Sequence, residues 1–402
     1  MSRPPKSVEL ADVFLRYGDA YIEKHNALMV QRKVIRSVSQ CRTAILGGHV
    51  SRCDHCSEQE ISYNSCRNRH CPKCQTTKQL QWLEDRKAEL LPVKYFHVVF
   101  TIPHELNGLA AYNQKVIYNI LFKAASQTVE ILGKDPGRKL GGQMGMLALL
   151  HTWSQNLSSH IHLHCIIPGG ALCEGDNQQK IWRSCVGKFL FPVKVMSKLY
   201  GKIFVTLLEE AYKNKDLVFK GAIEGLGGVL EFAKLIALQK TKSWNVYAKE
   251  PFNGAVGGIE YLARYVSKIA IGNERILSCE DGQVKFKWRD YANHNAQKVM
   301  TLDADEFIRR FLSHVLPDGF MRIRSSGFLA NACKARNLEL IRSLLGETVK
   351  ALEPALVEST VELIERITGV DILLCKHCKV GRLEIIQSIP RPKQSRHYQD
   401  TS

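Results

Sequence analysis

The segment from Ser159 to Gly170 constrains the fold more than any other part of this chain. Histidines alternate there with apolar residues, and such alternation predicts a β-strand, because successive side chains on a strand point to opposite faces. One face then carries His160, His162 and His164, while the residues between them can pack into a core. Histidines two residues apart on a rigid strand are well placed to hold one metal ion. A lone strand histidine is more often satisfied by hydrogen bonds or solvent, but three in alternation favour a metal.

The charge of the chain points to a polyanionic partner. Its 402 residues carry a formal net charge of +17, and this length has room for two or three domains. Nucleic acid is the commonest polyanion, because lysine and arginine release its condensed counterions on binding. A solvated basic surface is the simpler explanation of the charge alone. The sequence has no apolar run long enough for a membrane span and a polar start unlike a signal peptide, so we expect no membrane partner.

The cysteines indicate zinc rather than disulfides. Thirteen cysteines without a secretion signal are typical of a reducing compartment in which some thiolates bind metal. Two Cys-x-x-Cys pairs, Cys53/Cys56 and Cys71/Cys74, are separated by fourteen residues. This spacing predicts that both pairs close one tetrahedral zinc site. Four protein ligands leave no open position for chemistry, so the predicted site is structural.

Further potential metal ligands lie outside these two pairs. Cys66 and His70 could replace one of the four cysteines or hold a second ion. Cys375 and Cys378 form a third pair far along the chain, which cannot close a zinc site unless His377 or a donor from elsewhere joins it.

Basic residues surround the predicted zinc site. Arg52, Arg67, Arg69 and Lys73 lie beside its cysteines in the sequence. This clustering predicts a zinc-stabilised module that contacts DNA, with Arg67 and Arg69 as phosphate-binding residues. A purely architectural zinc is the alternative.

A second informative segment spans residues 258–269, where the pattern predicts a helix. Tyr261 and Tyr265 are one helical turn apart and therefore project together. Arg264 and Lys268 each follow a tyrosine by three residues and give this border a cationic edge. The geometry suits a phosphate that a tyrosine attacks, although a Tyr-x-x-x-Tyr pair by itself is more often two half-buried aromatics.

Taken together, these features predict one reaction. A divalent ion on the histidines would polarise a scissile phosphate, and a tyrosine hydroxyl would attack it. A phosphotyrosine bond keeps the free energy of the broken linkage, so the DNA strand can be rejoined elsewhere without ATP. A second tyrosine would permit a second transfer while the first end is still held.

The sequence resembles the two-tyrosine HUH transposases of rolling-circle insertion sequences, the insertion-sequence ninety-one family. The resemblance rests on five segments: residues 47–74, 95–106 (YFHVVFTIPHEL), 151–170, 261–271 (YLARYVSKIAI) and 307–328. It implies an α+β fold whose HUH endonuclease core has an antiparallel sheet carrying the histidines and a facing helix carrying the nucleophiles. It also implies cleavage and rejoining of single-stranded DNA at element ends and target through 5′-phosphotyrosine, with Mg²⁺ or Mn²⁺, in the bacterial cytoplasm.

The family motifs fall on particular residues of this chain. His162 and His164 match the histidine–hydrophobe–histidine motif, and Tyr261 and Tyr265 match the two nucleophiles. The family's zinc module falls on Cys53, Cys56, Cys71 and Cys74. The pair His160/His162 also fits the motif, so His160 is expected as a supporting residue or third ligand. Enzymes of this type usually use a third ligand, often Glu, Gln or His, which the sequence does not identify.

We expect three domains: a helical and zinc-binding domain over residues 1–92, a nuclease domain over 93–330 with a helical insertion at about 175–242, and a helical C-terminal region over 331–402 ending in a disordered tail. Two alternative functions share many of these features. A zinc-dependent DNA-binding regulator would use the tyrosines and histidines structurally, and a replication initiator or mobilisation relaxase would direct the same chemistry at an origin. A metal hydrolase of the barrel type is excluded, because the chain lacks the βα repeats that such a barrel needs.

Overall fold

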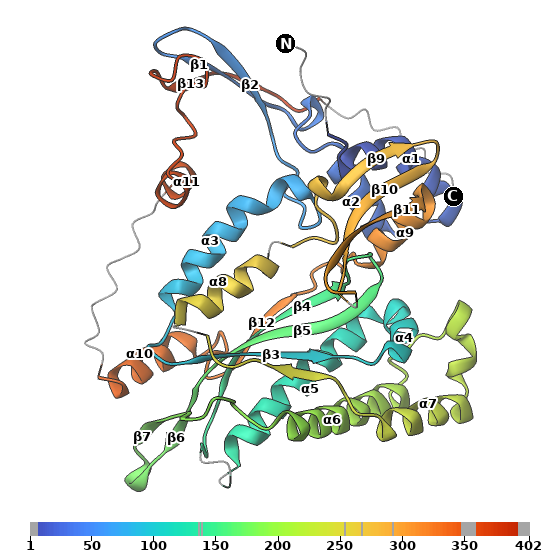
Figure 1. Cartoon of the computed structure of the whole chain (residues 1–402), viewed down its shortest axis with the longest axis vertical. Helices are drawn as coiled ribbons and strands as arrows, with labels where there is room; N and C mark the ends of the chain where they lie inside the picture. Colours follow the sequence, from blue (N-terminus) through green and yellow to red (C-terminus); the bar gives the residue numbers. More distant parts are fainter. Residues whose placement is uncertain are drawn as a thin grey trace. The chain divides into compact units, whose positions relative to one another are not determined.

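The computed structural model describes residues 7–135, 137, 140–252, 255–266, 268–291, 293–346 and 359–392, without the side chains of 75–78, 255, 262–264 and 360. The chain forms two compact units (Figure 1). One, the sheet unit, comprises Trp82–Val266 and Leu316–Ala355, and the other, the terminal unit, comprises Met1–Gln81, Ser267–Val315 and Leu356–Ser402. Both combine helices with antiparallel strands, so the predicted α+β class is confirmed.

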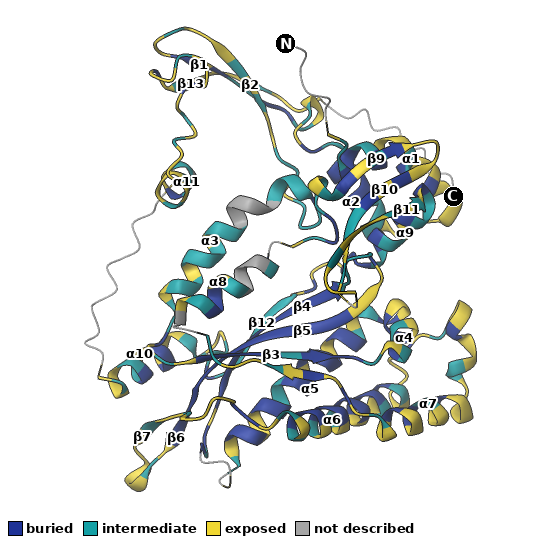
Figure 2. Cartoon of the chain, viewed as in Figure 1, coloured by how far each residue is buried: buried dark blue, intermediate teal, exposed yellow. Residues whose placement is uncertain are grey.

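The sheet unit is built on five strands in the order β12-β4-β5-β3-β8. These are β3 (Tyr95–Thr101), β4 (Gly145–Trp153), β5 (Ser159–Pro168), β8 (Val246–Ala248) and β12 (Ile323–Gly327). Every neighbouring pair is antiparallel. The central strands β3, β4 and β5 are buried along most of their length, which Figure 2 shows as dark blue ribbon. A sheet covered on both faces explains why their sequences are so apolar.

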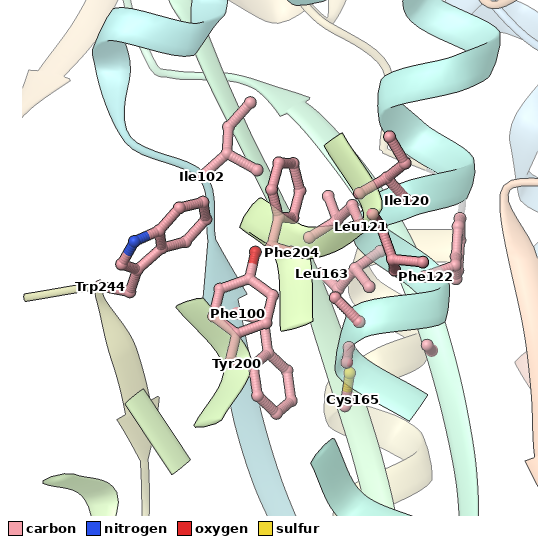
Figure 3. Close-up of a cluster of buried hydrophobic side chains, with 14 of the residues drawn as sticks. Phe100, Ile102, Ile120, Leu121, Phe122, Leu163, Cys165, Tyr200, Phe204 and Trp244 are labelled. Atoms are coloured by element: carbon pink, nitrogen blue, oxygen red, sulfur yellow. The ribbon is translucent and has the colours of Figure 1, made fainter. Parts of the chain in front are cut away.

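One face of this sheet holds the main hydrophobic core. Two 21-residue helices, α5 (Gln114–Lys134) and α6 (Val193–Lys213), bury apolar residues against it. Figure 3 shows Phe100 and Leu163 from the strands meeting Tyr200 and Phe204 of α6. The side chains of Leu163 and Cys165, which alternate with the histidines of β5, are therefore core residues, as predicted.

The opposite face is covered by α8 (Ala255–Val266), which packs against β3, β4 and β5. A smaller apolar cluster joins Ile259 and Val266 of this helix to Leu149 and Ile166 of the strands. The helix predicted over 258–269 thus exists, begins three residues earlier and ends at Val266. Its position brings its side chains to the face of β5 that carries the histidines.

The remaining elements of the sheet unit surround these layers. They are α3 (Gln75–Ala88), which begins in the terminal unit, α4 (Asn107–Tyr112), β6 (Gly170–Glu174), β7 (Lys180–Ser184), α7 (Val229–Thr241) and α10 (Lys334–Leu344). The sequence predicted a helical insertion at about 175–242, but this segment is not purely helical and is not separate from the core. Helix α6 forms a layer of the main core, and β7 pairs with β6 as a hairpin.

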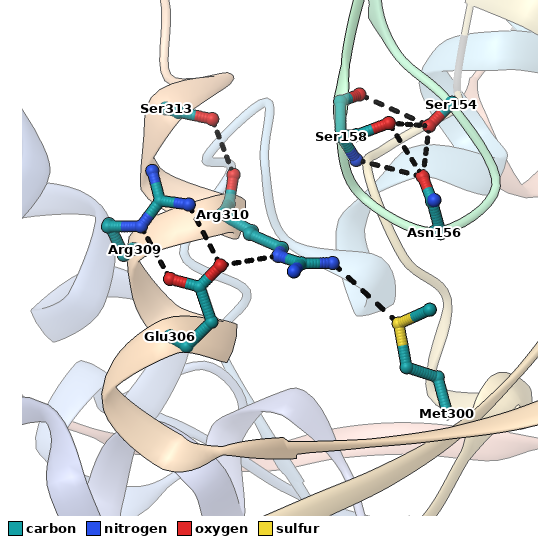
Figure 4. A network of polar contacts seen from close by, with 8 residues as sticks. All are labelled: Ser154, Asn156, Ser158, Met300, Glu306, Arg309, Arg310 and Ser313. Atoms are coloured by element: carbon teal, nitrogen blue, oxygen red, sulfur yellow. Dashed lines mark hydrogen bonds and ion pairs between the residues drawn. The ribbon is translucent and has the colours of Figure 1, made fainter.

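The terminal unit has helices α1 (Leu10–His25), α2 (Met29–Ser39) and α9 (Ala304–Ser313) beside a sheet of β9 (Ile276–Glu280), β10 (Gln283–Asp290) and β11 (Ala296–Asp303). On α9, Glu306 accepts hydrogen bonds from Arg309 and Arg310, as Figure 4 shows. These pairs hold the pKa of Glu306 down to about 2.

The domain boundaries differ from the expected ones in this region. Residues 267–315 were expected to belong to the nuclease domain, but they pack in the terminal unit.

A second, three-stranded sheet of the terminal unit joins the two ends of the chain. Strand β1 (Gly48–Cys53) lies between β2 (Gln59–Tyr63) and β13 (Leu383–Ile389). The expectation of a helical C-terminal region is therefore only partly right. Helices α10 and α11 (Thr360–Thr368) agree with it, but β13 is a strand that pairs with β1 of the N-terminal module. The predicted disordered tail falls on residues 393–402, outside the described residues. Within the described part of the chain, no helix is long and apolar enough to cross a membrane.

Candidate functional site

Three histidines converge on the face of the sheet beneath α8. The Nε2 atoms of His162 and His164 on β5 lie 3.1 Å apart, and Nδ1 of His151 on β4 lies 3.3 Å from Nε2 of His162. Two nitrogens bound to one ion at about 2.1 Å and at a right angle would be about 3.0 Å apart. The three side chains are 6–8% exposed, so this histidine cluster is enclosed by protein. The donor set and spacing fit one transition-metal ion.

The hairpin between β4 and β5 determines which residues meet. Its turn is closed by a hydrogen bond from the amide of Ser154 to the carbonyl of Ser158. Figure 4 shows a second one, from the amide of Ser158 to Oδ1 of Asn156. The resulting register sets His151 directly opposite His162. A slip of one residue would turn His151 to the core face, so the turn and the cluster are coupled.

His160, the expected supporting or third ligand, does not join the histidine cluster. It lies at the exposed start of β5, and the third histidine is His151 instead. The backbone of His160 still contributes, because Nδ1 of His162 donates a hydrogen bond to its carbonyl oxygen at 2.8 Å. This bond fixes the proton on Nδ1 and leaves the lone pair of Nε2 directed at the other two histidines.

Burial keeps His162 in the protonation state that a metal ligand needs. Burial, with further contributions from His160 and His97, lowers the pKa of His162 to about 3. His162 is therefore neutral at pH 7, which is the form of imidazole that binds metals.

A fourth histidine, His97 on β3, supports His164 from behind. Its Nε2 lies 3.0 Å from Nδ1 of His164, and its side chain is 1% exposed. Burial and the nearby Lys249 lower the pKa of His97 to about 4, so its ring is neutral and can accept a hydrogen bond. Sequence reasoning missed His97 and His151 as site residues. Both histidines lie on strands that the sequence predicted, and the alternation along each strand would have placed them on one face. That face is the one that also carries His162 and His164.

The two tyrosines of α8 lie against this cluster. The hydroxyl oxygens of Tyr261 and Tyr265 are 2.9 Å apart. The ring of Tyr265 packs against that of His164 with centroids 4.1 Å apart and ring planes 35° apart, and the ring of Tyr261 lies 4.8 Å from that of His97. Both side chains are partly exposed. The structure therefore brings together the tyrosines and two of the histidines that the sequence singled out, from segments about 100 residues apart.

The four basic residues expected to bind phosphate are less closely placed. Arg264 lies on α8 between the tyrosines, and its side chain is outside the described residues. Lys268 and Arg67 are exposed, whereas Arg69 is half-buried. Lys268, Arg67 and Arg69 belong to the terminal unit. Their phosphate contacts stay predictions.

The single zinc site predicted on Cys53, Cys56, Cys71 and Cys74 is wrong. The structure divides these residues between two clusters: Cys41, Cys66, Cys71 and Cys74 form the first, and Cys53, Cys56, Cys375 and Cys378 form the second. Each Cys-x-x-Cys pair therefore meets a different partner pair. The Cys-x-x-Cys spacing correctly marked these residues as members of metal-binding clusters, but spacing alone does not determine which cysteines share a site.

The first cluster fits a tetrahedral zinc ion. Its Cys74 Sγ lies 3.4 Å from Cys41 Sγ and 3.6 Å from Cys66 Sγ, close to the roughly 3.8 Å between two thiolates at 2.3 Å from one zinc. Cys66 is thus a member of this cluster, as one alternative held, and His70 is not. Cys41 stands alone before the Cys-x-x-Cys pairs, so no spacing pattern marked it as a ligand.

Comparison with known proteins identifies the family. A protein of Sinorhizobium fredii described as "Putative transposase y4qJ" is 43% identical over 383 residues, which is 94% of this chain and 95% of that protein. The chain belongs to the IS91 family of transposases. Residues 13–102 match the family model "Transposase zinc-binding domain", and residues 145–336 match the model "Putative transposase".

A more distant relative also matches. The "Transposase for insertion sequence element IS801" of Pseudomonas savastanoi pv. phaseolicola is 24% identical over 308 residues, covering 75% of this chain and 71% of that protein. No solved structure matches the chain. The transposase model spans His151, His162 and His164 as well as both tyrosines of α8, and the zinc-binding model spans the whole first cysteine cluster.

Proposed function

We propose that this transposase cleaves and rejoins single-stranded DNA through covalent phosphotyrosine, as rolling-circle transposition requires. The observation that carries the proposal is the contact of Tyr265 with His164, which puts a nucleophile on a three-histidine cluster. Tyr261 and Tyr265 are the proposed nucleophiles. The net charge of +17 supports a nucleic-acid substrate.

His151, His162 and His164 are the residues that would hold a catalytic divalent ion. Three imidazole ligands suit Mn²⁺ better than Mg²⁺, which prefers oxygen ligands. When bound, such an ion would polarise the scissile phosphate as a Lewis acid. The proposal therefore favours Mn²⁺ among the two ions that the family resemblance implies.

The tyrosines supply the covalent chemistry. The phenolic oxygen of one tyrosine forms a bond to the phosphorus, and the bond from phosphorus to the 3′ oxygen breaks. The phenol gives up its proton and the departing 3′ oxygen takes one up, so the products are a 5′-phosphotyrosine and a free 3′ hydroxyl. In the reverse step a 3′ hydroxyl attacks the phosphotyrosine and restores the DNA backbone. Because the two hydroxyls are neighbours, the second tyrosine can receive another 5′ end while the first is still occupied.

The test uses purified protein, Mn²⁺ and single-stranded oligonucleotides from the DNA that flanks its gene. A denaturing gel would reveal a covalent protein–DNA adduct. We expect an adduct that requires the metal and that disappears in the double variant Tyr261→Phe/Tyr265→Phe. The matched control is Tyr247→Phe, because Tyr247 is an exposed tyrosine on β8 of the same unit.

Tight DNA binding without an adduct on any flanking strand would contradict the proposal and favour a DNA-binding regulator. An adduct formed only on an origin-like sequence, and never on the ends of the element, would favour a replication initiator or relaxase. The flanking oligonucleotides test the first alternative, and origin-like oligonucleotides added to the set test the second.

A further inference from the structure

We infer that the second cysteine cluster is a separate zinc site that fastens the C-terminal strand to the N-terminal module. It consists of Cys53, the last residue of β1, Cys56, which follows that strand, and Cys375 and Cys378, which precede β13. The zinc-binding family model ends at residue 102, so it includes only half of these ligands. This site is independent of the proposed DNA chemistry.

The sulfur positions fit zinc and exclude a disulfide. Sγ of Cys53 lies 3.6 Å from Sγ of Cys378, and Sγ of Cys56 lies 3.8 Å from Sγ of Cys375. Two thiolates on one tetrahedral zinc are about 3.8 Å apart, whereas a disulfide bond is about 2.05 Å long. All four sulfurs lie within 4.8 Å of one another.

The two halves of the site have matching backbones. In the first, the amide of Ser57 donates to the carbonyl of Cys53 at 3.1 Å, and in the second the amide of Lys379 donates to the carbonyl of Cys375 at 2.9 Å. The residue after each pair is left-handed, with φ of 60° at Ser57 and 57° at Lys379. Two such turns, facing each other, form a site built for one ion.

Hydrogen bonds to sulfur and between the halves support this geometry. The amide of Cys56 donates to Sγ of Cys53 at 3.5 Å, and the amide of Gly381 donates to Sγ of Cys378 at 3.3 Å. The halves are joined directly, because the amide of Arg382 donates to Oδ1 of Asp54 at 2.8 Å. A Cβ at Gly381 would lie 2.6 Å from Sγ of Cys53, so this close approach requires glycine.

The surrounding sheet needs such a site, because it buries little apolar surface. Ile61 on β2 is 55% exposed, and Ile385 on β13 is 67% exposed. Three strands with so little burial are marginal in water, and metal binding is a known source of folding free energy in small modules. The ion would connect ligands 319 and 325 residues apart and thereby hold β13 against β1.

Zinc content tests the inference. Zinc could also occupy the histidine cluster, so every protein compared carries His162→Ala/His164→Ala. In that background we expect two zinc ions per chain without further substitution and one in Cys375→Ser/Cys378→Ser. Cys53→Ser/Cys56→Ser should also bind one, and so should the variant with all four substitutions, because both pairs share the same ion. The control Cys185→Ser/Cys333→Ser, at partly buried cysteines outside both clusters, should keep two. A parent with one zinc, or a Cys375→Ser/Cys378→Ser variant that keeps both, would overturn the inference.

A second measurement needs no cysteine substitution and remains informative if the variants fail to fold. A protease site inserted between Gly346 and Ser359 allows the folded, zinc-loaded full chain to be cut. The C-terminal fragment should co-elute with the rest of the protein and dissociate when a chelator removes the zinc. A fragment that dissociates with zinc still bound, or that stays bound after zinc is removed, would contradict the proposed role. Neither measurement depends on DNA cleavage. A failure of this inference is therefore distinguishable from a failure of the proposed function.

Discussion

Nε2 of His97 lies 3.0 Å from Nδ1 of His164, on the side of the His164 ring away from the histidine cluster. If Nε2 of His164 binds a metal, its Nδ1 carries the proton and donates to His97. A buried acceptor in this position fixes the tautomer and orientation of the metal-binding ring. His97 is therefore a positioning residue in the proposed mechanism.

Substitution of His97 should weaken metal binding more than it weakens DNA binding. We expect His97→Leu to lower Mn²⁺ affinity by about 10- to 100-fold, the effect usual for a residue that orients a ligand. His97→Gln, which keeps an acceptor, should lose less. Calorimetric Mn²⁺ titration checks this, with cleavage at saturating Mn²⁺ measured in parallel. Equal Mn²⁺ affinities for His97→Leu and the parent would show that the contact only packs the core.

The histidine cluster makes opposite predictions for two histidines near the β4–β5 hairpin. His151→Ala should remove a proposed ligand and reduce Mn²⁺-dependent cleavage by more than about 100-fold, which exceeds the effect of a supporting residue. His160→Ala should remain closer to the parent, because the His160 ring packs beside the His162 ring with centroids 4.7 Å apart but adds no nitrogen to the histidine cluster. Adduct yield against Mn²⁺ concentration provides the measurement. If His160→Ala lost activity and His151→Ala kept it, the assignment of the third ligand would be wrong.

The two tyrosines should not be equivalent. The Tyr265 ring packs against His164, whereas the Tyr261 ring also lies beside His97, Phe252 and Lys249. We expect Tyr265→Phe to reduce the first cleavage by more than about 10³-fold, as loss of a nucleophile does. Tyr261→Phe should still cleave but fail at the second transfer. Single-turnover cleavage and strand-joining assays separate the two steps, and the reverse pattern would make Tyr261 the initiating residue.

A core residue offers a test of stability. The Tyr200 side chain is fully buried, and within the described residues its hydroxyl has no hydrogen-bond partner. An unsatisfied buried polar group destabilises a protein, so Tyr200→Phe should raise the free energy of unfolding by about 1 kcal/mol. Phe204→Ala, in the same core, should lower it by roughly 3–5 kcal/mol. Denaturant unfolding of both variants provides the comparison, and a destabilised Tyr200→Phe would indicate a partner for the hydroxyl, such as buried water.

Local patterns were sufficient for much of the fold and for half of the site. Alternation identified β5 and the shared face of His162 and His164, because the two-residue repeat of a strand is a local property. Helical spacing likewise paired Tyr261 with Tyr265, because residues four apart share a face of any helix. The Cys-x-x-Cys pairs indicated zinc for the same reason.

The sequence by itself therefore determined the chemical types present: strand histidines, paired tyrosines and cysteine pairs that bind metal. Only the tertiary structure decided their combinations. The hairpin register selected His151 over His160, the order of strands brought His97 behind His164, and the pairing of β13 with β1 assigned Cys53 and Cys56 to Cys375 and Cys378. These choices depend on backbone pairing between distant segments, and the spacing of residues along one segment carries no information about the register of another.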